Sequence, residues 1–194
     1  MKIIAATSNK GKVREIKSIF SGEDFEIISM KEAGLEREIE ENGTTFEENA
    51  LIKARTIAQL CDCAVLSDDS GLCVEALNGA PGIYSARYGG EDTTYDVKMK
   101  KLLDEISDAD NRSAKFVSAC ALVYPDGREL VGMGEVHGRI GFEPKGENGF
   151  GYDPIFISDE LNKTFAEATD DEKNSISHRK RALMDLYNKM RNEE

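Results

Sequence analysis

The chain has 194 residues, of which 40% are hydrophobic and 32% are charged, and its formal net charge is −12. This composition is typical of a globular protein and excludes disordered and fibrous proteins, and the length fits a single domain over residues 1–194. The acidic excess disfavours nucleic acid and anionic membranes as partners, but a few converging Lys and Arg residues can still bind a small phosphorylated ligand.

The first third of the sequence is predicted to alternate between strands and helices. Short apolar runs predict strands, and apolar residues that recur every three or four positions predict helices. Thr45 and Glu48 have the spacing of a capping box, which marks the start of a helix. The predicted elements are a strand at 3–6, a polar loop at 7–12, a helix over 13–20, a strand at 25–28, an acidic loop at 31–44 and a helix from 45 to about 60.

The rest of the sequence adds a long hairpin and further helices. A strand at 64–67 is expected to end in the polar run 68–71, where the backbone should turn sharply. Asn78-Gly79 is a strong turn signal, and Thr169 and Glu172 again have capping-box spacing. The other predicted elements are an extended stretch at 72–77, a helix over 95–106, strands at 115–124 and 129–140 joined by a turn at 125–127, a Gly-rich loop at 141–154, a strand at 155–157 and a last helix that continues through Met190.

Strand–helix units combined with a long hairpin favour an α/β fold with a long central mixed β-sheet flanked by helices. No internal repeat, linker or low-complexity tract divides the chain. The order of the strands in the sheet does not follow from these patterns.

Cysteine, histidine and the N-terminal sequence exclude several other classes. Cys61, Cys63, Cys73 and Cys120 form no C-x-x-C pair and lie in or beside apolar stretches, so they are predicted to be reduced, buried thiols. With two histidines and no H-E-x-x-H or G-x-S-x-G motif, a His-based metal site or a Ser-His-Asp hydrolase is disfavoured. No apolar run is long enough to span a bilayer, and the N-terminus lacks the features of a signal peptide, so a cytoplasmic location is predicted.

Two segments could bind phosphate. The loop of Ser8, Asn9, Lys10, Gly11 and Lys12 precedes a helix, and backbone N–H groups at a helix N-terminus favour anions. The alternative is an ordinary strand–helix turn in which Ser8 or Asn9 caps the helix. Lys53 lies at the edge of the apolar face of its helix, where it either snorkels to solvent or points into a cleft that holds an anion.

Two pairs of carboxylates are candidates for a magnesium site. Asp68 and Asp69 follow an apolar strand, and Glu40 and Glu41 precede the helix that carries Lys53. Mg²⁺ prefers oxygen ligands and commonly combines one or two carboxylates with water and phosphate oxygens. The alternatives are a turn or a helix cap for the Asp pair and a solvated acidic loop for the Glu pair.

The C-terminal third supplies further candidates. Arg179 falls on the apolar face of the last predicted helix, where a guanidinium needs a partner or a ligand, Lys173 borders that face, and His178 is expected to point away from it. Structural pairing with acidic residues is the alternative for these cations. The loop at 149–154 places Phe150 between glycines, which suits a ring that stacks on a base or, alternatively, one that packs inward.

Six motifs resemble, in order and spacing, the Ham1/RdgB family of inosine/xanthosine triphosphate pyrophosphatases, and they span nearly the whole chain. The motifs are Thr7-Ser8-Asn9-x-x-Lys12, Phe46-x-Glu48-Asn49-Ala50-x-x-Lys53-Ala54, Ser67-Asp68-Asp69-Ser70-Gly71-Leu72, Gly79-Ala80-Pro81-Gly82-x-Tyr84-Ser85-Ala86-Arg87, Gly149-Phe150-Gly151-Tyr152-Asp153-Pro154 and Ser177-His178-Arg179. Ser8 stands where many members of that family have Gly.

The resemblance implies Mg²⁺-dependent hydrolysis of ITP, dITP and XTP to the monophosphate and pyrophosphate. It also implies a homodimer that keeps aberrant purines out of nucleic acid, and a two-lobed fold with the substrate cleft between the lobes. The family roles fall on the following residues: Asp69 as general base and metal ligand, Glu40 or Glu41 as support for the metal, Thr7 to Lys12 and Lys53 as triphosphate ligands, and Ser70, Phe150, Gly151, Tyr152, Asp153, Lys173, His178 and Arg179 around the nucleoside.

The mechanism that the resemblance implies leads to an expectation about the pKa of Asp69. A carboxylate beside a metal and Lys cations should have a lowered pKa, so Asp69 is expected to stay ionised. Two rival functions remain open. One is a pyrophosphatase for pyrimidine or methylated nucleotides, as in the similar Maf fold, and the other is a nucleotide sensor that binds without turnover.

Overall fold

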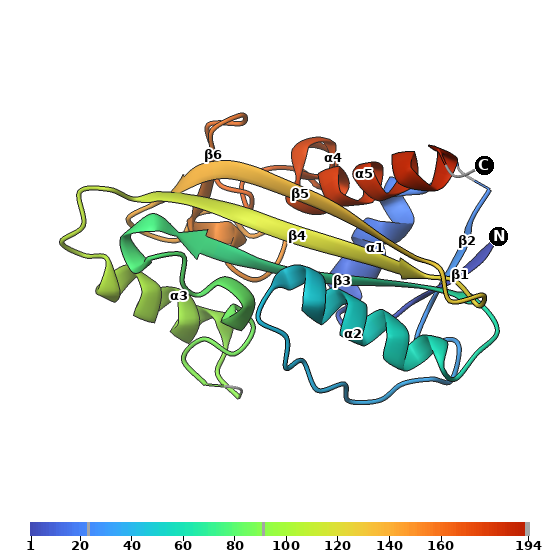
Figure 1. The fold of residues 1–194 in the computed structure, drawn as a ribbon. Coiled ribbons are helices and arrows are strands. Elements are labelled where there is room, and N and C mark those ends of the chain that lie inside the picture. Colours follow the sequence, from blue (N-terminus) through green and yellow to red (C-terminus); the bar gives the residue numbers. More distant parts are fainter. Residues whose placement is uncertain (23, 91, 193–194) are drawn as a thin grey trace. The chain divides into compact units, whose positions relative to one another are not determined.

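Strand–helix units are followed by a run of strands and then by two helices in the computed structural model, which describes residues 1–22, 24–90 and 92–192. The elements of these residues, shown in Figure 1, are β1 (Lys2–Ala5), α1 (Lys10–Ile19), β2 (Glu26–Ser29), α2 (Phe46–Ala58), β3 (Ala64–Val74), α3 (Tyr95–Glu105), β4 (Ser113–Val123), β5 (Glu129–Ile140), β6 (Phe156–Ser158), α4 (Asp170–Ile176) and α5 (His178–Asn192), together with short 3-10 helices at Glu75–Leu77, Gly82–Tyr84 and Asp153–Ile155.

The strands form one mixed sheet in the order β2-β1-β3-β4-β5-β6. Strand β1 pairs in parallel with β2 and β3, whereas β5 pairs with β6 in antiparallel fashion. A tight turn joins β4 to β5, and in it the Tyr124 amide donates to the Arg128 carbonyl over 2.9 Å. The α/β class and the mixed sheet predicted from the sequence are confirmed.

The chain divides into two compact units. Unit 1 comprises Met1–Asp69, Ser118–Gly134 and Arg179–Glu194, and unit 2 comprises Ser70–Val117 and Glu135–His178. Strands β3, β4 and β5 therefore contribute residues to both units.

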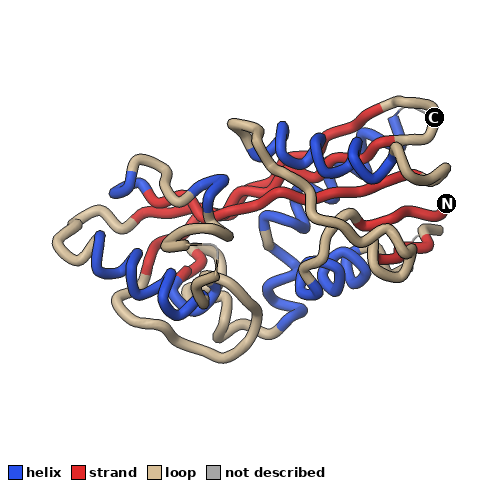
Figure 2. Tube along the Cα trace, turned by 90° about the horizontal axis from the view of Figure 1, so that it is seen from below, coloured by secondary structure: helices blue, strands red, loops and turns tan. Residues whose placement is uncertain are grey.

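Unit 1 has a hydrophobic core on each face of its strands. Because successive strand residues point to opposite faces, Ile3 of β1 packs in the cluster that contains α1 and α5, and Ile4 packs in the cluster that contains α2. Leu66 and Val65 of β3 alternate in the same way. Figure 1 shows α2 on one side of these strands and α1 and α5 on the other, and Figure 2 shows the long loop that leads into α2.

Unit 2 has its own core around α3 and a group of aromatic rings. Met99 and Leu102 of α3 are buried in this core. The Phe116 ring on β4 stacks parallel to that of Phe165, with centroids 5.9 Å apart, and Phe156 meets both rings edge-on.

Several predicted boundaries are wrong. Strand β3 does not end at residue 67 but continues through the polar run 68–71 to Val74, because the side chains of that run find partners on both faces of the sheet. The single last helix is two helices, since Ser177 has extended backbone with ψ 154° between α4 and α5. Helix α2 ends at Ala58, two residues before the predicted end.

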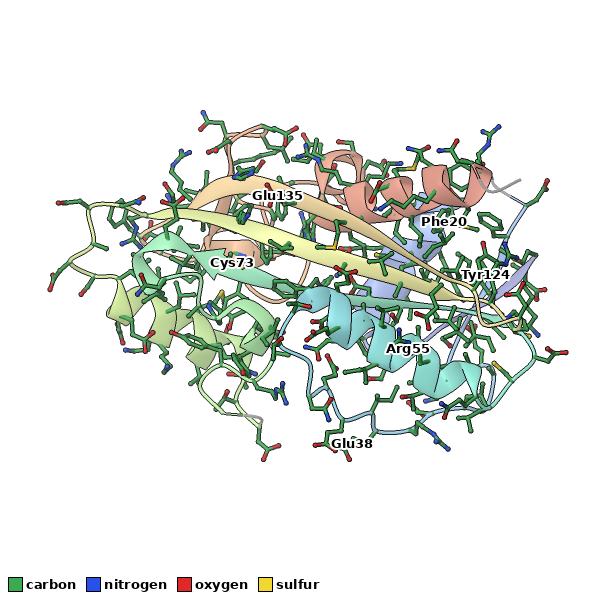
Figure 3. All side chains as sticks on the ribbon, viewed as in Figure 1. Phe20, Glu38, Arg55, Cys73, Tyr124 and Glu135 are labelled. Carbon is green, nitrogen blue, oxygen red and sulfur yellow. The ribbon has the colours of Figure 1, made fainter. Side chains whose placement is uncertain are left out.

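The four cysteines are free thiols, as predicted, but only Cys120 is buried, and the other three, including Cys73 (Figure 3), are half-exposed. The described helices include none with the length and apolar character required to cross a bilayer.

Candidate active site

The two aspartates inside β3 serve opposite faces of the strand. Adjacent strand residues point in opposite directions, so Asp68 faces the α1/α5 side and Asp69 faces α2. Both side chains are buried, with 1% of Asp68 and 7% of Asp69 exposed. The predicted sharp turn at these residues is therefore wrong, and it is the continuous strand that separates the two carboxylates.

Asp68 is the centre of a buried ion-pair network in unit 1. Its Oδ1 lies 2.5 Å from Lys12 Nζ and 3.3 Å from an Arg179 guanidinium nitrogen. Its Oδ2 accepts a hydrogen bond from Ser118 Oγ over 2.7 Å. The Glu15 carboxylate of α1 pairs with the other end of the Arg179 guanidinium. Arg179, which is 1% exposed, therefore has carboxylate partners in the protein.

Asp69 is the centre of the second group, on the α2 side. Lys53 Nζ donates to Asp69 Oδ1 over 3.0 Å and to Glu41 Oε2 over 2.9 Å. Lys53 is 8% exposed, so it does not snorkel to solvent. Asp69 Oδ2 is buried and has no hydrogen-bond partner among the described residues. Of the two candidate glutamates, Glu41 lies in this group, and Glu40 is exposed.

The two aspartates differ in electrostatic environment. Burial alone would raise the pKa of Asp68, but attraction from Arg179 and Lys12 outweighs burial and lowers it well below the ordinary range. Burial raises the pKa of Asp69, with Lys53 and Lys12 opposing the shift and Glu41 reinforcing it. The expected lowering of the Asp69 pKa is therefore not found in the protein alone, because desolvation outweighs the nearby ammonium groups.

The loop before α1 has the geometry of a helix cap. Asn9 is the N-cap of α1, and its Oδ1 accepts from the amides of Gly11 and Lys12 over 2.9 and 3.2 Å. Thr7 Oγ1 in turn accepts from the Asn9 amide. Ser8 and Lys10 are exposed, and Lys12 reaches back to Asp68. The helix cap that the sequence offered as the alternative for this segment is therefore present, with Asn9 as the capping residue, and Lys10 is the exposed lysine of the loop.

The donors around Asp69 fit a hard divalent cation. Carboxylate oxygens are the ligands Mg²⁺ prefers, and Asp69 keeps one buried oxygen without a hydrogen bond. Within the ranges that the structure describes, no group of three or more His, Cys, Asp and Glu residues is arranged to hold a metal. A site that used Asp69 and Glu41 would therefore need ligands from substrate phosphate and water, which is the usual situation for Mg²⁺.

The predicted nucleoside residues of unit 2 form a second buried network. Asp153 Oδ2 accepts from Lys173 Nζ over 2.7 Å and from the Phe150 amide over 2.8 Å. The Lys173 ammonium also lies 4.6 Å from the centroid of the half-buried Phe150 ring. Gly149 has φ +73°, and a Cβ there would lie 2.1 Å from Asp153 Oδ2, so this close contact between loop and carboxylate requires glycine.

The other predicted residues of unit 2 are buried or half-buried. The Tyr152 hydroxyl donates to the Ser85 carbonyl over 2.9 Å, and Gly151 and Ser70 are half-buried. His178 is 4% exposed and stacks on the Phe116 ring, with centroids 4.8 Å apart. The expectation that His178 points away from the core is wrong, because the break at Ser177 ends the helical phase from which it was inferred.

Two buried partners of the site, Glu15 and Ser118, lie outside the motifs that indicate it, whereas Asn49 lies inside one of them. Glu15 and Ser118 complete the Asp68 network, and Asn49 holds the loop that carries Glu41. Ser118 interrupts an apolar strand, and Glu15 is next to the core residue Ile16, so a polar residue among buried neighbours was the available signal in each case.

Comparison with known proteins places this chain in one family. The family model described as the Ham1 family matches residues 3–189. A protein of Thermoanaerobacter pseudethanolicus named dITP/XTP pyrophosphatase is 50% identical over 190 residues, which cover 97% of this chain and 96% of that protein. A protein of the same name from Exiguobacterium sibiricum is 49% identical over 188 residues, covering 96% and 95%.

The fold comparison agrees with the sequence matches. The structure of the Ham1 protein of Staphylococcus aureus superposes with a TM-score of 0.89 and 41% sequence identity, and the match covers 100% of both chains. Matches in sequence and fold thus extend over nearly the whole length, and the chain belongs to the Ham1 family.

Proposed function

We propose that this protein is a Mg²⁺-dependent pyrophosphohydrolase that converts the non-standard purine triphosphates dITP, ITP and XTP to the monophosphate and pyrophosphate. The names of the relatives support this substrate class. The proposed catalysis depends on the environment of Asp69, whose carboxylate is buried. One of its oxygens accepts a hydrogen bond from Lys53, and the other has no hydrogen-bond partner among the described residues.

In the proposed reaction, water attacks the α-phosphorus, the bond from this phosphorus to the oxygen that bridges to the β-phosphorus breaks, and pyrophosphate leaves. The Asp69 carboxylate is assigned to accept the proton of the attacking water, while Lys53 orients it through Oδ1. Lys12 and Lys53 are assigned to stabilise the negative charge on the phosphate oxygens. The products are the nucleoside monophosphate and pyrophosphate, which accounts for every atom of triphosphate and water.

The proposed metal ion would be held by Asp69 and Glu41. When bound, Mg²⁺ would neutralise charge on the phosphate oxygens and orient the triphosphate. Glu41 is preferred over Glu40 because its carboxylate shares the Lys53 ammonium with Asp69, whereas Glu40 is exposed.

Recognition of the nucleoside is assigned to the residues that the family resemblance implies, around Asp153, Lys173 and Phe150. Inosine and xanthosine carry an acceptor oxygen at the purine 6-position, where adenine carries an amino donor. If a buried protein group donates a hydrogen bond at this position, that donor is left unpaired when adenine binds. Such a site can lower kcat/KM for the adenine nucleotide by several orders of magnitude. A half-buried aromatic ring such as Phe150 suits stacking on a purine.

The proposal also includes a homodimer in the cytoplasm that removes aberrant purines before they enter nucleic acid. The homodimer follows from the family resemblance, and the cytoplasmic location is the expectation drawn above from the sequence. Sedimentation velocity over a range of protein concentrations tests the assembly, for which a species of about twice the chain mass of 21.4 kDa is expected.

Release of pyrophosphate from a panel of triphosphates, with and without Mg²⁺, tests the proposed activity. Rapid Mg²⁺-dependent release is expected from dITP, ITP and XTP and slow release from ATP, dTTP and UTP. Preference for dTTP or UTP would instead support the pyrimidine pyrophosphatase. A rise in Tm on addition of dITP without any release would support the nucleotide sensor.

A further inference from the structure

The loop between β2 and α2 is attached to α2 at three points. The Gly43 amide donates to Asn49 Oδ1 over 2.8 Å. The Thr44 amide and hydroxyl both donate to Glu48 Oε2, over 2.6 and 2.8 Å. Farther back along the loop, Glu41 accepts from Lys53. Figure 1 shows this segment running alongside α2, and in Figure 3 the labelled Glu38 lies on the outer side of the segment.

The spacing of these attachments matches the geometry of the two segments. Asn49 and Lys53 are four residues apart on α2, which separates them by about 6 Å along the helix axis. Gly43 and Glu41 are two residues apart on the loop, which spans about 6.6 Å in an extended chain. The contact between Gly43 and Asn49 therefore fixes the register in which Glu41 meets Lys53.

Gly43 allows no side chain at this contact. A Cβ on Gly43 would lie 2.7 Å from both Asn49 Oδ1 and Glu48 Cβ, so the loop approaches the helix as closely as backbone permits. Asn49 is 0% exposed, and its Nδ2 has no hydrogen-bond partner among the described residues. The bond to Gly43 is thus the interaction that truncation at Asn49 would remove.

We propose that Asn49 is a positioning residue, which acts through Gly43 to hold the loop against α2 and so places the Glu41 carboxylate beside Lys53 and Asp69. Its consequence for the metal rests on the proposed function, in which Glu41 is a ligand. The placement of the loop is independent of the proposed function, and it can be measured in the protein without substrate or metal.

Hydrogen exchange of the ligand-free protein tests the placement directly. In the Asn49→Ala variant, amides in residues 38–45 are expected to exchange about fivefold faster or more, as loss of one net hydrogen bond implies. Glu48→Ala is a second variant at an exposed site, and it should loosen the same segment by removing the attachment at Thr44. Glu47→Ala is its matched control, an exposed neighbouring glutamate in the same helical turn, and it should leave exchange unchanged.

Binding of Mn²⁺, followed by electron paramagnetic resonance, tests the consequence for the metal. Loss of a group that orients a ligand commonly weakens metal binding about tenfold or more, and this is expected for Asn49→Ala. In a Glu41→Gln background, Asn49→Ala should add little, because the ligand that it positions is already lost.

Three outcomes would overturn the proposal: unchanged exchange at 38–45 in a folded Asn49→Ala protein, equal loosening by Glu47→Ala, or a full tenfold effect of Asn49→Ala in the Glu41→Gln background. If the wild-type protein binds no Mn²⁺ and hydrolyses no dITP, the proposed function fails. The exchange experiment then still decides whether Asn49 places the loop.

Discussion

Arg179 and Asp68 form an ion pair that solvent does not reach: an Arg179 guanidinium nitrogen lies 3.3 Å from Asp68 Oδ1, and the two side chains are 1% and 0% exposed. Burial alone would lower the pKa of Arg179, but Asp68 and Glu15 outweigh it and raise the pKa above its already high value. Buried charges are costly unless each is matched, and here Glu15 and Lys12 complete a balanced set of two cations and two anions.

Replacement of Asp68 by Asn should therefore destabilise the protein strongly. The substitution keeps the shape but leaves Arg179 and Lys12 with one carboxylate fewer, and breaking a buried pair in this way costs about 3–5 kcal/mol. Urea unfolding at pH 7 measures the loss. A loss below about 1 kcal/mol would mean that the pair contributes no more than a surface salt bridge.

The destabilisation caused by Asp68→Asn should also depend on pH. The folded-state pKa of Asp68 is lowered from the ordinary 3.8, so the unfolded chain binds a proton more readily than the folded one. The stability that Asp68 contributes is then fully present above pH 3.8 and declines as the pH falls below it. The difference in unfolding free energy between wild type and Asp68→Asn should be constant from about pH 7 to 5 and shrink in more acidic buffer. A difference that grew on acidification would reverse this sign.

Lys53 should be essential for turnover. Its removal leaves Glu41 and Asp69 without their shared counter-ion and deletes the donor that is proposed for the triphosphate. Loss of one preorganised donor typically lowers kcat by a factor of about 100–1,000, and Lys53→Ala should reach this range with dITP. Lys17→Ala is the matched control, because Lys17 pairs with Glu32 on the surface and should leave kcat and KM unchanged. Wild-type kinetics for Lys53→Ala would remove Lys53 from the site.

Gly132 of β5 should tolerate no side chain, because α5 packs directly on it. A Cβ there would lie 2.2 Å from the Ala182 carbonyl oxygen and 2.5 Å from the Leu186 amide nitrogen. Gly132→Ala is expected to lower stability by about 1–3 kcal/mol, the usual cost of overpacking, measured as a lower urea midpoint. Met133→Ala, at the exposed neighbouring position, should change the midpoint little. Equal effects of the two would show that the contact with α5 can relax.

Much of the fold follows from local sequence, because each element carries its own signal. The boundaries of β5 agree with the prediction to the residue, since an alternating run begins just after a Pro-Asp-Gly turn. The capping box predicted at Thr169 and Glu172 forms both of its hydrogen bonds. By contrast, the polar run 68–71 predicts a strand end, whereas the strand continues through it. The partners that satisfy Asp68 and Asp69 in mid-strand come from distant segments, which local sequence does not reveal.

The residue types of the candidate site could be predicted from the sequence, but the way in which they pair and point could be predicted only in part. The sequence supplies the acids and lysines, and the structure brings Lys12 and Arg179 to Asp68 and Lys53 to Asp69. The choice of Glu41 over Glu40 and the burial of His178 depend on loop register and on a helix break. Those are tertiary features that a helical-wheel argument does not contain.

Asp69 is the proposed catalytic base, and the Asp69→Asn variant tests this role. Amide for carboxylate preserves shape, and Lys53 keeps Glu41 as its partner. The variant should therefore fold and still bind dITP, while kcat for Mg²⁺-dependent pyrophosphate release should fall by about 1,000-fold or more. Single-turnover release of pyrophosphate from dITP by wild type and variant, with binding measured in parallel, is the decisive measurement. Retention of near-normal kcat by a folded Asp69→Asn protein would contradict the account.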